Sequence, residues 1–252
     1  MSTQYDDYAK KFETIKFKRE DGILEMTIHT NNDSLRWGPT AHTELEQAFL
    51  DIGRDPENQL IILTGTGKEF SGPEVTPSTD RAVPKLTVEQ WGKLGSEARR
   101  FTMNMLNIEV PMIGVVNGPA LRHPELPLLC DIVIGSDDCA FQDSAHFRGG
   151  MVPGDGVNAV FQLLIGMNRA RYFLYTAQVI GAKQALDLGL VSELHPKDKV
   201  LTRAWEHART LMKQTPMNRR YTRATLIEPL RRQMNEILGY GLALEGLVIC
   251  QQ

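Results

Sequence analysis

The sequence predicts an α/β fold in which a sheet-containing core is followed by a helical C-terminal region. Three continuous apolar runs end in or near glycines, at 60–67, 111–119 and 131–136. Such runs are typical of parallel strands, because helices cover both faces of a parallel sheet. Helical patterns alternate with these runs at first, and strand patterns nearly vanish after residue 155. This order predicts a core over 1–195 and a helical region over 196–252.

The elements of the first part follow in order. Residues 22–30, GILEMTIHT, predict a strand, since apolar and β-branched residues follow a DG turn. Residues 40–57 predict a helix with Thr40 as its N-cap. Its apolar face is expected to hold Leu45, Ala48, Phe49 and Ile52. A surface loop rich in Pro, Ser and Thr is expected at 73–88, a helix at 87–107 and a short strand at 140–143.

The second part reads as a series of helices. A tight turn, VPGDG at 152–156, is expected to open the first of them. The helical pieces are expected at 156–166, 169–177, 182–189, 201–214, 220–238 and 240–250.

Composition and charge exclude several classes of function. The net charge of −3 gives no sign of a nucleic-acid or membrane-surface partner. No apolar run is long enough to cross a bilayer, and the N-terminus has no signal-peptide pattern. The three cysteines, Cys130, Cys139 and Cys250, match no metal-site spacing. We therefore expect a cytoplasmic protein without a metal ion.

His146 and Asp155, on either side of the VPGDG turn, form the first candidate pair. A neutral imidazole is a useful base near neutral pH, because its free pKa is about 6.5. A carboxylate on its other nitrogen fixes the tautomer and stabilises the imidazolium that forms. The alternative stays open that Asp155 only caps the helix that follows it.

Four further side chains are candidates for the same site. His123 lies in a loop after a predicted strand, where a parallel sheet binds its ligands. Trp37, whose indole only donates, follows another strand and serves either packing or binding. Glu245 lies in a strongly apolar helix, either at a subunit interface or facing a cavity, where burial would keep it protonated. Glu125 is expected at the loop surface.

Several segments together resemble the crotonase (enoyl-CoA hydratase/isomerase) superfamily. They are LIILTGTGKEFSGPEV, VPMIGVVNGPAL, CDIVIGSDDCAFQDSAHFRGGMVPGDG and RARYFLYTAQVIGAKQALDLGLVSEL, in the family's order. The resemblance implies a crotonase-like spiral of repeated ββα units with a C-terminal helical trimerisation region. It also implies a homotrimer or a dimer of trimers.

The sequence departs from the family pattern at the positions that bind the thioester and at the catalytic glutamates. Pro73 and Glu74 stand where the family uses a backbone N–H in its oxyanion hole, and proline has none to give. His123 stands in the second oxyanion segment, where glycines are usual. The hydratase-type glutamates correspond to His146 and to Leu126, which is next to Glu125.

The replacements resemble one branch of the superfamily, the carbon–carbon bond hydrolases of cyclic β-diketones such as 6-oxocamphor hydrolase. SLRWGPTAHTELE, NGPALRHPELPLLCDIV, FQDSAHFRGGMVPGDG and GLALE carry that similarity. It implies a retro-Claisen reaction without cofactor or metal. His146 would activate water with Asp155, Trp37 and His123 would bind the carbonyl oxygens, and Glu245 would orient His123 or supply a proton.

Two other functions stay open at this stage. One is an atypical acyl-CoA hydratase, isomerase or decarboxylase, which needs two backbone donors and a groove for coenzyme A. The other is a non-catalytic trimeric scaffold. Asp155 has a second open role as well, since it could contact the substrate directly instead of orienting His146. The sequence leaves the identity of the diketone open.

Overall fold

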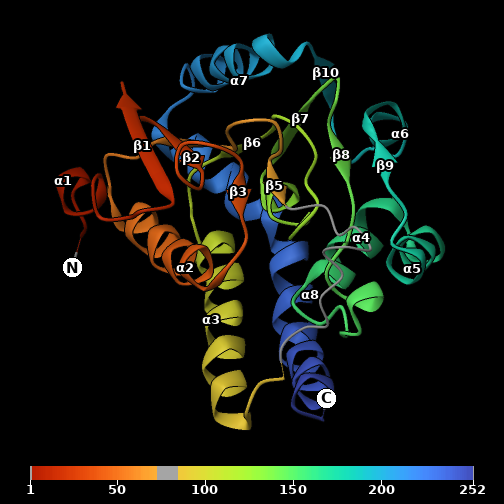
Figure 1. Cartoon of the computed structure of the whole chain (residues 1–252). Helices are drawn as coiled ribbons and strands as arrows, with labels where there is room; N and C mark the ends of the chain where they lie inside the picture. The colour runs from red at the N-terminus through yellow and green to blue at the C-terminus, as the bar shows by residue number, and fades with distance from the viewer. Residues whose placement is uncertain (1, 73–84, 252) are drawn as a thin grey trace.

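The computed structural model describes residues 2–72 and 85–251. A six-stranded sheet of order β1-β2-β4-β6-β7-β10 forms its centre (Figure 1). β1 is antiparallel to β2, and the remaining neighbours are parallel. The strands are β1 (Ile15–Glu20), β2 (Ile23–Ile28), β4 (Leu60–Thr64), β6 (Met112–Val116), β7 (Ile132–Ser136) and β10 (Glu193–His195).

Short strands form a second layer. β3 (Leu35–Arg36) pairs with β5 (Ser71–Gly72), and β8 (Ala140–Phe141) pairs with β9 (Ile180–Gly181). Ala120 bridges both pairs, through Ser71 and Phe141. Successive units therefore give one strand to the large sheet, one segment to the second layer, and then a helix. This is the predicted crotonase-like spiral of ββα units.

Helices cover both faces of the large sheet. They are α1 (Tyr5–Tyr8), α2 (Pro39–Arg54), α3 (Val88–Leu106), α4 (Val157–Ile165), α5 (Met167–Thr176), α6 (Ala182–Asp187), α7 (Lys197–Leu211) and α8 (Pro216–Gln251), with 3₁₀ turns η1 (Pro127–Leu129) and η2 (Phe147–Gly149). The apolar face of α7 packs on one side of the sheet, and α2 and α3 pack on the other. None of the helices in the described part of the chain is long and apolar enough to cross a bilayer.

Three of the expected elements differ in detail. The N-cap of α2 is Gly38 and Thr40 lies inside the helix, because Pro39 begins it. The two helices expected over 220–250 are one helix, α8. Strands β1 and β10, which no pattern predicted, complete the two edges of the sheet. Of the loop expected at 73–88, residues 73–84 lie outside the described part.

Two glycines bring α8 against the loop before α4. A Cβ on Gly241 would lie 2.3 Å from the carbonyl oxygen of Gly154, and a Cβ on Gly154 would lie 2.2 Å from that of Gly241. Only glycine allows two backbones to approach so closely. Asp155 follows Gly154, and Glu245 lies one helical turn after Gly241. The contact therefore sets how Asp155 and Glu245 face each other.

Candidate active site

The predicted site residues converge on one cavity of about 330 Å³. Trp37 follows β3, His123 follows the Ala120 bridge, His146 follows β8, Asp155 precedes α4, and Glu245 comes from α8. These residues are far apart in the sequence, and the second layer and α8 bring them together.

The rest of the cavity wall is mostly apolar. α3 and α8, which run side by side in Figure 1, supply much of it. The apolar lining residues are Leu86, Trp91, Leu94, Ala98, Ala145, Met151, Leu242 and Ile249. A polar end and an apolar body are typical of small-molecule sites.

His146 is buried and held by a carboxylate at each ring nitrogen. Nδ1 lies 2.8 Å from Oδ1 of Asp143, and Nε2 lies 3.3 Å from Oδ2 of Asp155. The orienting contact that we expected from Asp155 is therefore made at Nδ1 by Asp143. Asp143 was missed, although its position three residues before the histidine in one turn was a signal.

Asp155 contacts both the start of α4 and the two histidines. Its Oδ1 accepts a hydrogen bond at 3.2 Å from Val157 N, in the first residue of α4, whose N-cap is Gly156. Its Oδ2 lies between His123 Nδ1, at 3.2 Å, and His146 Nε2, at 3.3 Å. Neither of these ion pairs has the angles of a hydrogen bond, which leaves Oδ2 able to accept from a third partner.

His123 is fixed by its backbone and by two neighbours. Its φ of +47° is left-handed, which is uncommon for a residue other than glycine and occurs often at functional sites. Nδ1 lies 2.7 Å from Oε1 of Glu125, and the ring packs on Trp37 at a centroid distance of 3.9 Å. The expectation that Glu125 lies at the surface is wrong, since it is buried as the partner of His123.

Glu245 faces His146 and not His123, to which no described contact joins it. Its Oε1 lies 3.8 Å from His146 Nε2. Burial, together with the charge of Asp155, raises the pKa of Glu245 to about 8. At neutral pH this carboxyl group therefore holds a proton, as we expected for a glutamate in an apolar helix.

His42, on α2, is a site residue for which the sequence gave no signal. It is buried, lines the cavity, and lies with Nδ1 3.6 Å from Glu97 of α3. Burial lowers its pKa to about 4, and the neighbouring charge of His123 acts in the same direction. His42 is therefore a neutral imidazole beside the more basic His123.

The pKa values of the remaining titratable groups are shifted by their neighbours, because imidazoles and carboxylates alternate along the polar end of the cavity. Burial alone would lower the pKa of His146, but the charges of Asp143 and Asp155 outweigh it and raise that pKa well above its usual value. Burial would raise the pKa of Asp155, yet the two histidines lower it overall. For Glu125, burial and the charge of Asp155 raise the pKa. Such opposed shifts within one cavity are typical of sites that carry out acid–base chemistry.

One set of side chains has the spacing of metal ligands. Atoms of His123, Glu125 and Asp155 lie within 4.8 Å of one another. The same His123 nitrogen, Nδ1, already contacts both carboxylates. Binding an ion there would break the contacts that orient His123.

The two family positions before α3 cannot be compared in the structure. Pro73 and Glu74 lie outside the described residues.

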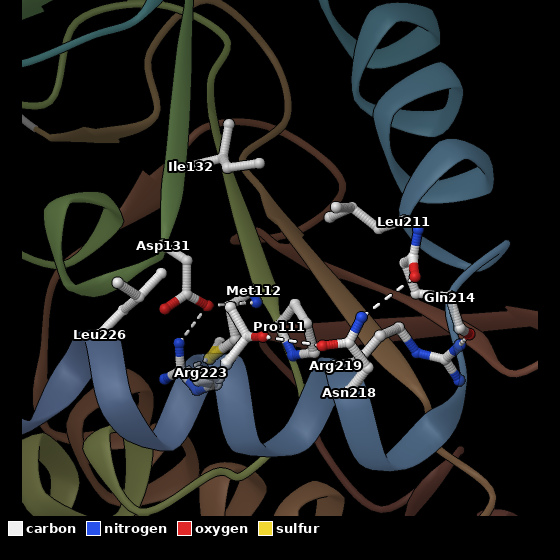
Figure 2. Close-up of a pocket in the computed structure, with 11 residues that line it drawn as sticks. Pro111, Met112, Asp131, Ile132, Leu211, Gln214, Asn218, Arg219, Arg223 and Leu226 are labelled. Atoms are coloured by element: carbon white, nitrogen blue, oxygen red, sulfur yellow. Dashed lines mark hydrogen bonds and ion pairs between the residues drawn. The ribbon is translucent and has the colours of Figure 1, made fainter.

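A second cavity, of about 310 Å³, lies at the amino ends of β6 and β7, beside the start of α8. Figure 2 shows Arg223 facing Asp131, which also accepts a hydrogen bond from Met112 N at 2.7 Å. Arg219 donates to Gln59 Oε1 at 3.0 Å. Arg223 and Asp131 thereby join α8 to the starts of β6 and β7, which is a structural role.

The chain is similar to several known proteins. A solved structure of a β-diketone hydrolase from the cyanobacterium Anabaena sp. PCC 7120, bound to (S)-3-oxocyclohexyl acetic acid, is 43% identical, with a TM-score of 0.90 and 97% of each chain covered. Curated relatives include a probable peroxisomal enoyl-CoA hydratase of Arabidopsis thaliana, 30% identical over 79% of this chain and 73% of its own.

Another curated relative is a hydroxycinnamoyl-CoA hydratase-lyase of Pseudomonas fluorescens, 26% identical over 83% of this chain and 76% of its own. Residues 18–244 match the family model described as enoyl-CoA hydratase/isomerase. The chain therefore belongs to the enoyl-CoA hydratase/isomerase family, the crotonase superfamily.

Proposed function

We propose that this protein is a carbon–carbon bond hydrolase that opens cyclic or bicyclic β-diketones to keto acids by a retro-Claisen reaction. The observation that carries the proposal is the polar end of the cavity, where His146 lies between carboxylates and opposite the Trp37–His123 pair. The likeness to the Anabaena hydrolase supports it.

The first step is the attack of water on one carbonyl carbon. In the neutral form of His146, which its raised pKa places at alkaline pH, a water molecule beside Nε2 and Asp155 Oδ2 would give one proton to the imidazole and a hydrogen bond to the carboxylate. The imidazolium that forms is stabilised by Asp143 and Asp155, both within 3.3 Å of its ring nitrogens. General base catalysis of this kind contributes about 10²- to 10⁴-fold.

Negative charge then develops on oxygen twice, in the tetrahedral intermediate and in the enolate. Trp37 Nε1–H and His123 are assigned as donors to the two diketone oxygens. The contacts of His123 with Glu125 and Asp155 both use Nδ1, which leaves Nε2 for the substrate. Fixed donors that meet a developing oxyanion are among the strongest contributors to catalysis.

Carbon–carbon cleavage completes the reaction. The intermediate collapses to a carboxylic acid, and the bond to the central carbon breaks, with its electron pair moving into the second ketone as an enolate. A proton from His146, or from Glu245 at 3.8 Å from it, then reaches the enolate carbon. No group other than water is consumed.

The rival function is that of an atypical acyl-CoA hydratase or isomerase, which the names of the curated relatives favour. A hydratase of this family uses glutamates where this chain has His146 and the Leu126 region. His123 also fills the segment in which the family's backbone approaches a thioester. Both differences favour the diketone over the thioester. Shifted pKa values that gather in one cavity are more typical of a catalytic site than of a scaffold.

The test is to incubate the protein with 2,2-disubstituted cyclic and bicyclic 1,3-diketones in ¹⁸O-water and to separate the products by chromatography. We expect a keto acid with one ¹⁸O atom in its carboxylate, and a loss of at least about 100-fold in His146→Ala. Diketones that persist with the wild-type protein, while crotonyl-CoA is hydrated, would contradict the proposal.

Two expectations about the whole protein stay predictions. They are the homotrimer or dimer of trimers, which sedimentation equilibrium tests, and the cytoplasmic location.

A further inference from the structure

Asp143 stands behind His146 and not in the cavity wall. Its side chain is 1% exposed, and it is absent from the residues that line the cavity, whereas His146 and Asp155 are both present. Asp143 therefore contacts the cavity wall through His146, which makes it a candidate positioning residue.

Two contacts hold the imidazole to this carboxylate. Asp143 Oδ1 lies 2.8 Å from His146 Nδ1 and accepts from the backbone N of His146 at 3.3 Å. The segment itself is anchored by Ser144 N, which donates to Leu121 O at 3.3 Å. Since Leu121 lies two residues before His123, the same backbone contact fixes the loops that carry both histidines.

We propose that Asp143 is the positioning residue that keeps the proton of neutral His146 on Nδ1 and the lone pair of Nε2 facing the cavity. Asp155 consequently acts on the cavity side, where it holds the attacking water. This inference rests on the proposed function. A carboxylate can only accept a hydrogen bond, so its presence at Nδ1 selects the tautomer with a proton there.

The tautomer of His146 decides whether Nε2 can accept a proton, and the groups around the ring determine which tautomer is favoured. Asp143 faces Nδ1, while Asp155 and Glu245 face Nε2, and His123 lies across Asp155. Without Asp143, the negative charge of Asp155 would draw the proton to Nε2. That tautomer has no lone pair directed at the cavity and cannot accept a proton from water.

The test compares Asp143→Asn with the wild type in kcat, KM and pH profile, on a diketone that the wild type opens. We expect kcat to fall roughly 100- to 10,000-fold with little change in KM, because the substrate does not touch Asp143. We also expect the acidic limb of kcat/KM to move down by about 1 pH unit, since one of the two carboxylates that favour the imidazolium is gone.

Asp137→Asn is the matched control, since Asp137 is an exposed aspartate on the same segment. It should leave both the rate and the limb unchanged. An Asp143→Asn variant with wild-type kcat and an unmoved limb would overturn the inference. So would a loss that appears only as lower thermal stability.

A second readout does not depend on turnover. Nitrogen-15 NMR of labelled imidazoles, assigned with His146→Gln, reports the tautomer and pKa of His146 directly. We expect the proton on Nδ1 in the neutral wild type, and a lower pKa with loss of this tautomer in Asp143→Asn. If no diketone is opened but the NMR result holds, the proposed function fails and the role of Asp143 stands. If the tautomer is the same in both proteins, the role of Asp143 fails.

Discussion

Trp37 packs on His123 at the polar end of the cavity, so its ring and its N–H can be tested separately. Trp37→Phe keeps an aromatic face against His123 but removes the donor. We expect kcat to fall roughly 100- to 1,000-fold, as for the loss of one oxyanion donor. Steady-state kinetics on a diketone measure this.

The control for that variant is Trp205→Phe on α7. Trp205 donates to Glu25 at 2.7 Å, in contact with the far face of the sheet, and does not line the cavity. The Trp205→Phe substitution should lower the melting temperature and leave kcat unchanged. Full activity in Trp37→Phe would show that Trp37 only packs.

Because the pKa of Glu245 is raised, we expect the free energy of unfolding to depend on pH. Its pKa is about 8 in the folded protein and about 4.3 in an unfolded chain. Between these values the folded protein holds a proton that the unfolded chain has released. The stability that Glu245 contributes is therefore fully present below the pKa of the unfolded chain, and it is lost as the pH rises toward the pKa of the folded protein.

Glu245→Gln removes this titration. The free energy of unfolding of the wild type should fall relative to the variant from pH 5 to 8, by at most about 1.4 kcal/mol per pH unit. Urea denaturation of both proteins at several pH values measures the difference. A difference that stays constant with pH would show that Glu245 is charged in the folded state.

For individual residues, the sequence predicted which side chains lie at the cavity better than it predicted which of them contact each other. His146 and Asp155 were predicted as a pair because they flank one tight turn, and Glu245 because it is a carboxylate in an apolar helix; the structure places all three at one cavity. Asp143 was missed although it lies only three residues before His146, which it contacts. His42 was missed because its role comes from a contact that only the fold creates, the packing of α2 on α3 beside His123.

Among the elements, α8 controls the site through the contact of Gly241 with Gly154. Gly241→Ala would place a methyl group 2.3 Å from a backbone oxygen, so the helix must move. Overpacking of this kind costs about 1 to 3 kcal/mol. We also expect lower kcat, because Glu245 moves with the helix. Thermal unfolding and kinetics check both.

Gly239→Ala is its control on the same helix. Gly239 is exposed, and nothing lies within 4 Å of the added Cβ. Alanine should stabilise the helix there by up to about 1 kcal/mol and leave kcat unchanged. Equal effects of the two substitutions would show that the close approach has no role.

The elements that the sequence predicted correctly are those with a strong local pattern. β4, β6 and β7 were found because buried parallel strands are continuous apolar runs. β10 has only three residues, all half-buried, which is too short a pattern to predict a strand. It forms because it pairs with the edge of β7. The break expected at Gly239 is absent, since packing along α3 keeps α8 continuous.

The whole molecule has the fold of its family and a cavity with several ionisable side chains. The large sheet, the second layer and α8 match a superfamily in which relatives are named as acyl-CoA hydratases. The polar end of this protein's cavity is lined by imidazoles and carboxylates. Function at this scale therefore depends on which electrophile the cavity accepts, a diketone or a thioester.

The most direct measurement is kcat/KM for a bicyclic 1,3-diketone and for crotonyl-CoA, with the same preparation, for wild type and His146→Ala. We expect turnover of the diketone, at least about 100-fold loss in the variant, and no hydration of crotonyl-CoA. Hydration of crotonyl-CoA, with the diketone left intact by the wild type, would contradict the proposal and make this protein an atypical coenzyme A enzyme.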